Sequence, residues 1–411
     1  MTAAERFQER LLDDARISPR YAPWLDRGPS LAALSETPLP EPRSYTWEYS
    51  NPNPWYEQNA RGTDSRPNAG KVVASGDTRV ADFDAADSRE RGIIEANLNA
   101  TIDRRRYPLA AVNDVLLCGG VVIEVPERAR GAQIELRDLG GSFERALLIV
   151  GAGAEATLVE SPAAPTHRVV ECLVGTGASL RHLRLQGAAD SFEYQLVSTR
   201  VEAGASYRFG QYAQGSGMRR NDVHIESAGD GADIGIHGAW HLSGQQHLDT
   251  QINVHHRISG GTSRQTVRGV VNDRAKAVFN GRIHIAPHAQ RTDAALSAKH
   301  MLLARTAQAY AKPELEIYAN DVRCAHGATM GEIDGDALFY LRSRGIGEPA
   351  ARNLLIAGFL EEAMADHGRE EARALLSPGS LQPGKLPRPL TRKEVSAFRL
   401  PADAYFHEKL S

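Results

Sequence analysis

The chain has 411 residues, of which 42% are hydrophobic and 24% charged, a composition typical of a globular protein with two or three structural units. Its formal net charge of -3 offers no basic surface for a phosphate backbone, so we expect no nucleic-acid partner. The cysteines Cys118, Cys172 and Cys324 are too scattered for a disulfide framework, and the sequence contains neither a secretory signal nor a membrane-length apolar run. We therefore expect a cytoplasmic protein with no membrane partner.

The N-terminal part is predicted to form a helical domain over residues 1–107. Residues 3–15 and 88–98 carry apolar side chains at helical spacing. Between them, the proline-rich stretch 38–42 cannot continue a helix, and an aromatic cluster surrounds Trp47.

Residues 108–340 are predicted to form the core. Apolar and polar residues alternate over 248–254 and 275–285, which is the pattern of strands with one buried face. Gly-Ala corners recur at spacings of 24, 27 and 27 residues, at Gly153, Gly177, Gly204 and Gly231. A strand-rich chain with such a period favours a parallel β-helix, although the repeat fades after Ala232; a β-sandwich is the alternative.

The C-terminal part, residues 341–411, is predicted to be helical, with a tail. A helix over 349–364 and a shorter one over 369–376 precede a Pro/Gly-rich linker, and residues 391–411 are expected to form a docked tail. The apolar stripe of the longer helix has two interpretations, a cap over the end of the solenoid or a docking surface for another subunit.

Few motifs carry chemistry. The sequence contains no P-loop, no G-x-S-x-G elbow and no C-x-x-C pair, and three scattered cysteines cannot supply four thiolates to one cluster. Cys324 and His326 are two residues apart, so a strand would place both side chains on one face, where they could bind a transition metal. The alternative is a buried cysteine beside a solvated histidine.

Histidines are dense between residues 237 and 300. Because His255 and His256 are adjacent, they must point to opposite faces of a strand. We therefore expect a polar outer face of stacked coils rather than one shared metal site, with the histidines at His237, His241, His247, His255, His256, His284, His288 and His300.

Two passages resemble the SufB/SufD family of iron–sulfur cluster assembly proteins. They are KPELEIYANDVRCAHGATMGEIDGDALFYLRSRGIGEPAARNLLIAGFLEEAM at 312–364 and NGRIHIAPHAQRTDAALSAKHMLLA at 280–304, with a weaker match, PEPRSYTWEYSN, near Trp47. Within the family, the SufB branch tends to carry R-V-E-H-E-A where this chain has residues 323–328, and a cysteine within the coil matching 297–300. This chain has neither and is more similar to the SufD branch.

The resemblance implies a mainly β chain, with a right-handed parallel β-helix core flanked by N-terminal and C-terminal helical domains. It also implies a non-catalytic scaffold that pairs with a SufB-like paralogue, docks a SufC-like ATPase and forms a possible homodimer in isolation. It assigns cluster assembly to His326, with Cys324 as a supporting thiol or a sulfur relay. It places the ATPase contact after Tyr340, at Arg344, Gly345, Ile346, Leu354, Phe359 and Leu360. No cofactor is expected to stay on the isolated chain, and a transient iron–sulfur cluster is expected at the interface with SufB.

Two other functions compete with the scaffold. A β-helix enzyme acting on carbohydrate would need paired carboxylates, but Asp249, Asp273 and Asp293 fall on different predicted coils. A purely structural partner subunit would leave His326 without a chemical role.

Overall fold

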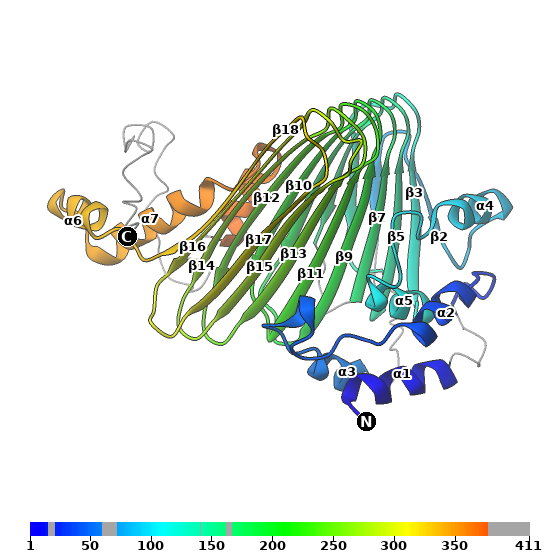
Figure 1. Cartoon of the computed structure of the whole chain (residues 1–411), viewed down its shortest axis with the longest axis horizontal. Helices are drawn as coiled ribbons and strands as arrows, with labels where there is room; N and C mark the ends of the chain where they lie inside the picture. The colour runs from blue at the N-terminus through cyan, green and yellow to red at the C-terminus, as the bar shows by residue number, and fades with distance from the viewer. Residues whose placement is uncertain (15–20, 60–71, 140, 162–166, 377–411) are drawn as a thin grey trace.

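The core is a β-solenoid of about eight turns built from two nine-stranded sheets (Figure 1). The computed structural model describes residues 1–14, 21–59, 72–139, 141–161 and 167–376. One sheet has the order β1-β4-β6-β8-β10-β12-β14-β16-β18 and the other β17-β15-β13-β11-β9-β7-β5-β3-β2. Strands two apart in the chain pair in parallel from β3 to β18, as stacked coils require. The mainly β prediction and the β-helix are confirmed, and the β-sandwich alternative is wrong.

The strands of the solenoid share a length of five to eleven residues, and the helices lie before and after them. The helical elements are α1 (Ala3–Asp14), α2 (Gly28–Glu36), η1 (Tyr45–Trp47), α3 (Asn53–Asn59), α4 (Ser88–Asn97), α5 (Pro108–Val115), α6 (Gly335–Ser343), α7 (Glu348–Glu361), η2 (Asp366–Gly368) and α8 (Arg369–Leu376). The coil strands are β3 (Gly119–Val125), β4 (Ala132–Leu136), β5 (Phe143–Val150), β6 (Glu155–Glu160), β7 (His167–Val174), β8 (Ser179–Gln186), β9 (Phe192–Val201), β10 (Ser206–Gln214), β11 (Met218–Ser227), β12 (Asp233–Leu242), β13 (His247–His256), β14 (Thr262–Val271), β15 (Lys276–Ile285), β16 (Thr292–Leu302), β17 (Gln308–Ile317) and β18 (Val322–Gly331). Two short antiparallel strands, β1 (Val72–Ser75) and β2 (Arg79–Asp82), start the sheets.

One corner of the solenoid is a column of residues in the left-handed conformation. Each donates its backbone N–H to a carbonyl of the next coil's corner, which links the turns along the axis. The column, with φ between +59° and +72°, consists of Arg128, Gly153, Gly177, Gly204, Gly231, Gly260 and Arg291. Glycine adopts this conformation without a Cβ penalty, which explains the Gly-Ala repeat.

The repeat fades in the sequence because the coils lengthen. Paired residues are 24 apart between Phe143 and His167, 27 apart between Ser206 and Asp233, and 30 apart between Asp293 and Arg323. The corner itself continues beyond Gly231, with non-alanine residues following its members.

The interior is apolar over most of its length but contains a buried ionic network among the early coils. Glu160 accepts hydrogen bonds from His182 Nε2 at 2.6 Å and Arg184 Nη2 at 2.8 Å, while Arg168 binds Glu144 at 2.5 Å. All five side chains are fully buried. Burial opposes ionisation of Glu160, but Arg184, His182 and Arg168 hold its pKa at about 2. Glu160 is therefore ionised inside the solenoid beside the guanidinium groups of Arg168 and Arg184, whereas burial raises the pKa of Glu144 to about 7.

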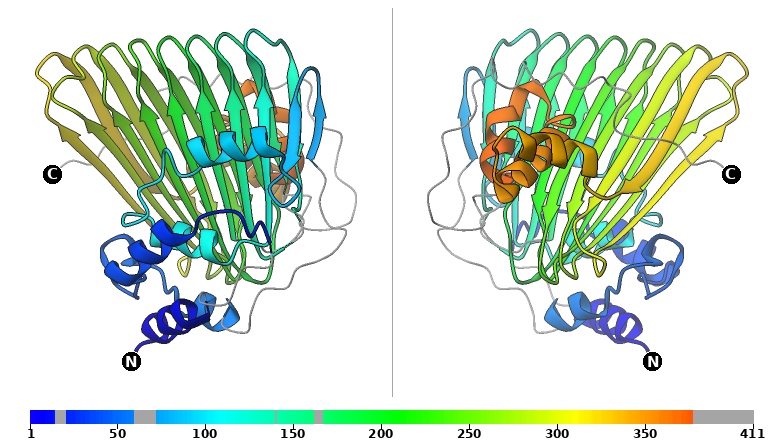
Figure 2. Two further views of the ribbon diagram at one scale, coloured as in Figure 1. Left: turned by 90° about the vertical axis from the view of Figure 1, so that its right-hand side faces the viewer. Right: turned by 90° about the vertical axis from the view of Figure 1, so that its left-hand side faces the viewer.

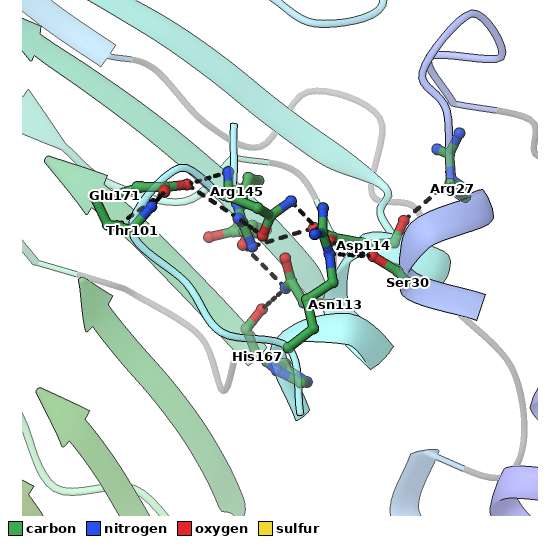
Figure 3. Close-up of polar contacts among 11 residues, drawn as sticks. Arg27, Ser30, Thr101, Asn113, Asp114, Arg145, His167 and Glu171 are labelled. Atoms are coloured by element: carbon green, nitrogen blue, oxygen red, sulfur yellow. Dashed lines mark hydrogen bonds and ion pairs between the residues drawn. The ribbon is translucent and has the colours of Figure 1, made fainter. Parts of the chain in front are cut away.

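The N-terminal helices are attached to the outer face of the first coils by a second buried polar cluster (Figure 3). Arg145 on β5 lies 3.2 Å from both Asp114 at the end of α5 and Glu171 on β7. Ser30 of α2 donates a hydrogen bond to Asp114, and the Thr101 backbone N–H and hydroxyl both donate to Glu171. Because these groups are buried, the cluster fixes the helices in one position on the sheet.

The C-terminal helices α7 and α8 lie along the outer face of the sheet that contains β8, β10, β12 and β14 (Figure 2). Ile356, Leu360 and Leu376 are buried against Leu183 and Tyr212 of these strands. The expectation that the longer helix caps the end of the solenoid is therefore wrong, because its apolar stripe fits the flat face of a sheet.

Several smaller expectations have clear outcomes. The predicted helices over 3–15, 88–98, 349–364 and 369–376 are present as α1, α4, α7 and α8. Helix α5 opens the region predicted to be strands, because a short apolar run has no distinctive period. The linker and the docked tail lie outside the described residues. Within those residues, no helix combines the length and apolarity that spanning a bilayer requires.

Candidate functional site

The last coil presents Cys324 and His326 on the core-facing side of β18. Their register partners on β16 are Ala294 and Leu296, both buried in the core. Because β17 and β18 are the terminal strands of their sheets, no further strand among the described residues covers this face. Cys324 is half-buried against the core, whereas His326 is exposed. The strand thus holds a thiol and an imidazole side by side at the open end of the solenoid.

The chemistry of this pair is limited. Burial raises the pKa of the Cys324 thiol, and the carboxylate of Asp293 acts in the same direction, so the thiol is largely protonated at neutral pH. In the part of the chain that the structure describes, no three His, Cys, Asp or Glu side chains are grouped to hold a metal ion. The described residues beside this pair therefore do not complete an iron site.

The surroundings of the pair form an exposed apolar edge. Ile317, Tyr318 and Met330 are large apolar or aromatic residues that solvent reaches in the last coil. A long strand edge with unpaired backbone groups and apolar side chains is a template for pairing with another chain. Sequence alternation alone could not show this edge, because it does not reveal which coil is last.

The residues predicted to contact the ATPase fall into two groups. Arg344 and Gly345 are exposed at the end of α6, and Ile346 is half-buried. On α7, Leu354 and Phe359 are half-buried, whereas Leu360 is 1% exposed and packs against the solenoid.

Two aromatic residues of α6 were not identified from the sequence. Phe339 is 72% exposed and Tyr340 43% exposed, and the Arg344 guanidinium lies 5.1 Å from the Tyr340 ring. Two adjacent aromatic residues in a helix without a strong apolar stripe are the sequence feature from which their exposure could have been predicted.

The histidines divide between the two sides of the wall. His256 and His300 are buried inside, whereas His255 and His284 lie on the outer face with ring centroids 4.3 Å apart. The expectation that His255 and His256 point to opposite faces is confirmed, and the expected polar outer face holds for only part of the set. His224, one coil before His255, joins the outer group; it was not predicted, because it lies outside the histidine-dense stretch from residue 237 to residue 300.

Comparison with known families identifies the class of protein. Residues 133–359 match the family model described as SUF system FeS cluster assembly, SufBD core domain. The match covers more than half of the chain, which therefore belongs to this family.

The chain is a homologue of SufD. It is 36% identical over 173 residues to the iron–sulfur cluster assembly protein SufD of Escherichia coli (strain K12), which is 41% of each chain. It is 29% identical over 235 residues to an iron–sulfur cluster assembly SufBD family protein of Synechocystis sp., covering 54% of this chain and 52% of that one. It is also 29% identical over 248 residues to protein ABCI7, chloroplastic, of Arabidopsis thaliana, covering 58% and 52%. The chain thus spans about half the length of these relatives, or less.

Proposed function

We propose that this chain is a non-catalytic scaffold subunit of a cytoplasmic iron–sulfur cluster assembly complex. The observation that carries the proposal is the open last coil, which offers an unpaired strand edge together with Cys324 and His326. A partner that pairs with this edge would place its own side chains beside the thiol and imidazole. A transient cluster could then be completed by ligands from both chains, and the isolated chain would hold none stably.

The partner proposed for the edge is a SufB-like paralogue, with a second copy of this chain as the substitute in isolation. The test is a double variant, Ile317→Lys/Met330→Lys, which places charges on the edge. Both side chains are exposed, so the fold should keep its stability within about 0.5 kcal/mol. Co-elution with the paralogue in size-exclusion chromatography should be lost, since charged side chains oppose strand pairing.

The matched control is Val73→Lys/Val80→Lys, which charges two exposed valines on β1 and β2 at the opposite end of the sheets. This variant should co-elute with the paralogue as the unaltered chain does. Equal loss of pairing by both variants, or by neither, would count against the edge.

The proposed ATPase surface is the exposed part of α6 and the start of α7. Phe339, Tyr340 and Arg344 extend away from the solenoid, and exposed aromatic and arginine residues are frequent in interface hot spots. Phe339→Ala/Tyr340→Ala should abolish capture of a SufC-like ATPase while leaving unfolding unchanged. Undiminished capture of the ATPase by this variant would show that the docking site lies elsewhere.

Of the two competing functions, the carbohydrate enzyme gains no support from the carboxylates. Asp249 and Asp293 lie in different sheets and form ion pairs with Arg220 and Arg264, and Asp273 lies at a corner with φ of +53°. The purely structural partner differs from the scaffold only in the role of His326, which iron and sulfide analysis of the complex with His326→Ala tests.

A further inference from the structure

A small cavity opens on the outer face of the sheet that does not contain Cys324 and His326. It has a volume of about 110 Å³ and lies over strands β11, β13 and β15, where the segment before α5 crosses them. His224, Asn253 and Arg282 are register neighbours in one column, and His255 and His284 are neighbours in the next. The residues that line the cavity are Arg106, His224, Asn253, Val254, His255, Arg282 and His284.

The lining is rich in hydrogen-bond donors and carries no carboxylate. The Arg282 guanidinium is held in place by two hydrogen bonds to Glu316, which lies outside the lining. Arg106 donates to the Asn253 side-chain oxygen at 2.8 Å and forms no ion pair with any residue the structure describes. The Glu316 carboxylate, whose pKa is lowered by Arg282 and also by Arg106, offsets part of this positive charge from outside the lining.

One group in the wall lacks a partner. His224 is 9% exposed, and its buried Nδ1 atom makes no hydrogen bond to any described residue. Burial lowers the pKa of His224 to about 4, as does the nearby Arg106, and burial with the His284 ring lowers that of His255 to about 4. Both imidazoles are neutral at pH 7 and can each donate one N–H, whereas the two guanidinium groups repel a metal cation.

We propose that this cavity binds one tetrahedral oxyanion of the phosphate or sulfate type, with Arg106 as the main cation and Arg282, His224 and His255 as further donors. The volume suits a single small ion, since each water molecule of the liquid takes about 30 Å³. Guanidinium groups recognise phosphate and sulfate oxygens through charge-assisted hydrogen bonds. The inference is independent of the scaffold role, and the cavity borders the proposed assembly edge, since the His284 ring lies 5.4 Å from the Tyr318 ring.

The test is isothermal titration calorimetry of inorganic phosphate into the full chain at pH 7 and low salt. We expect one site per chain, and at least tenfold weaker binding by Arg106→Gln. Arg106 is exposed and lies between elements, so this variant should fold normally. The matched control is Arg130→Gln, which removes an exposed arginine paired with Glu155 on another coil and should bind phosphate as the unaltered chain does.

A second measurement locates the ion. Phosphate should shift the ¹⁵N-imidazole signals of His224 and His255, assigned by His224→Gln and His255→Gln, and leave the exposed His288 unchanged. ADP serves as a further arm: displacement of phosphate by ADP would assign the site to a terminal phosphoryl group, and its failure would assign the free ion. No phosphate binding up to about 20 mM, unweakened binding by Arg106→Gln, or binding of Zn²⁺ in place of phosphate would overturn the proposal.

Discussion

Acidification should destabilise this fold steeply, because several histidines are buried in the neutral form. Burial lowers the pKa of His167 to about 3, and burial lowers those of His256 and His300 to about 4, aided by His255 and Arg268 respectively. In the unfolded chain these groups titrate near pH 6.5. Between pH 6.5 and 4 the unfolded state binds more protons than the folded state, so stability is complete above this window and is lost as the pH falls through it.

The magnitude follows from proton linkage. Lowering the pH from 7 to 5 should cost about 2 kcal/mol of unfolding free energy for each such histidine, or about 6 kcal/mol for the three. Glu144 acts in the opposite sense, because burial raises its pKa to about 7, and it offsets about one histidine. These three histidines and Glu144 together thus account for a loss of about 4 kcal/mol, which is a large part of the 5–15 kcal/mol typical of a domain.

The assay is urea unfolding followed by tryptophan fluorescence at pH 7, 6 and 5, comparing the unaltered chain with His300→Gln. The variant keeps a neutral polar group but cannot take up the proton, so its loss between pH 7 and 5 should be smaller by about 2 kcal/mol. His288→Gln, at an exposed turn, should behave like the unaltered chain. If His300→Gln shows the same pH dependence as the unaltered chain, the assignment of acid sensitivity to buried histidines is refuted.

Three further predictions concern stability, each measured by urea unfolding at pH 7. Gly204→Ala should destabilise the fold by about 1–2 kcal/mol, because the φ of +63° at Gly204 disfavours a Cβ. Gly358→Ala, in a helix with open space around it, should stabilise the fold by about 0.5–1 kcal/mol. The opposite order would contradict the role of the corner. Leu360→Ala should cost about 2–5 kcal/mol and Phe339→Ala almost nothing, and equal costs would contradict the attachment of α7 to the sheet. Glu160→Gln should cost about 3–5 kcal/mol by leaving buried guanidinium groups uncompensated, and a neutral result would show that the network is dispensable.

The strands and the corner could be predicted from the sequence, because both depend on local rules of backbone conformation and side-chain alternation. Alternation over 275–285 corresponds to β15, whose Ala277, Phe279 and Ile283 point into the core. Four glycines of the left-handed column appeared as a repeat because the early coils differ by only a few residues. Gly260 continues the column, but a longer coil and a following glycine hide it.

The candidate sites were harder to predict from the sequence, since they depend on which coils are neighbours. His224, His255 and His284 are 31 and 29 residues apart, which matters only once the register of β11, β13 and β15 is known. The burial of Leu360 could not be predicted either, because an apolar stripe does not reveal which surface it contacts. The pairing of Cys324 with His326 could be predicted, because strand periodicity alone places both side chains on one face.

The central claim is that His326, on the open last coil, supports cluster assembly together with a partner chain. The direct measurement is iron and acid-labile sulfide bound after anaerobic reconstitution of the complex with the SufB-like and SufC-like partners, using the unaltered chain, His326→Ala and the exposed control His288→Ala. We expect His326→Ala to form the complex normally in size-exclusion chromatography but to retain much less iron and sulfide, whereas the control should retain both. Cys324→Ala should lose less than His326→Ala if the thiol only packs against the core. Full iron and sulfide content with His326→Ala in an intact complex would refute the role of His326 and leave the chain as a purely structural partner.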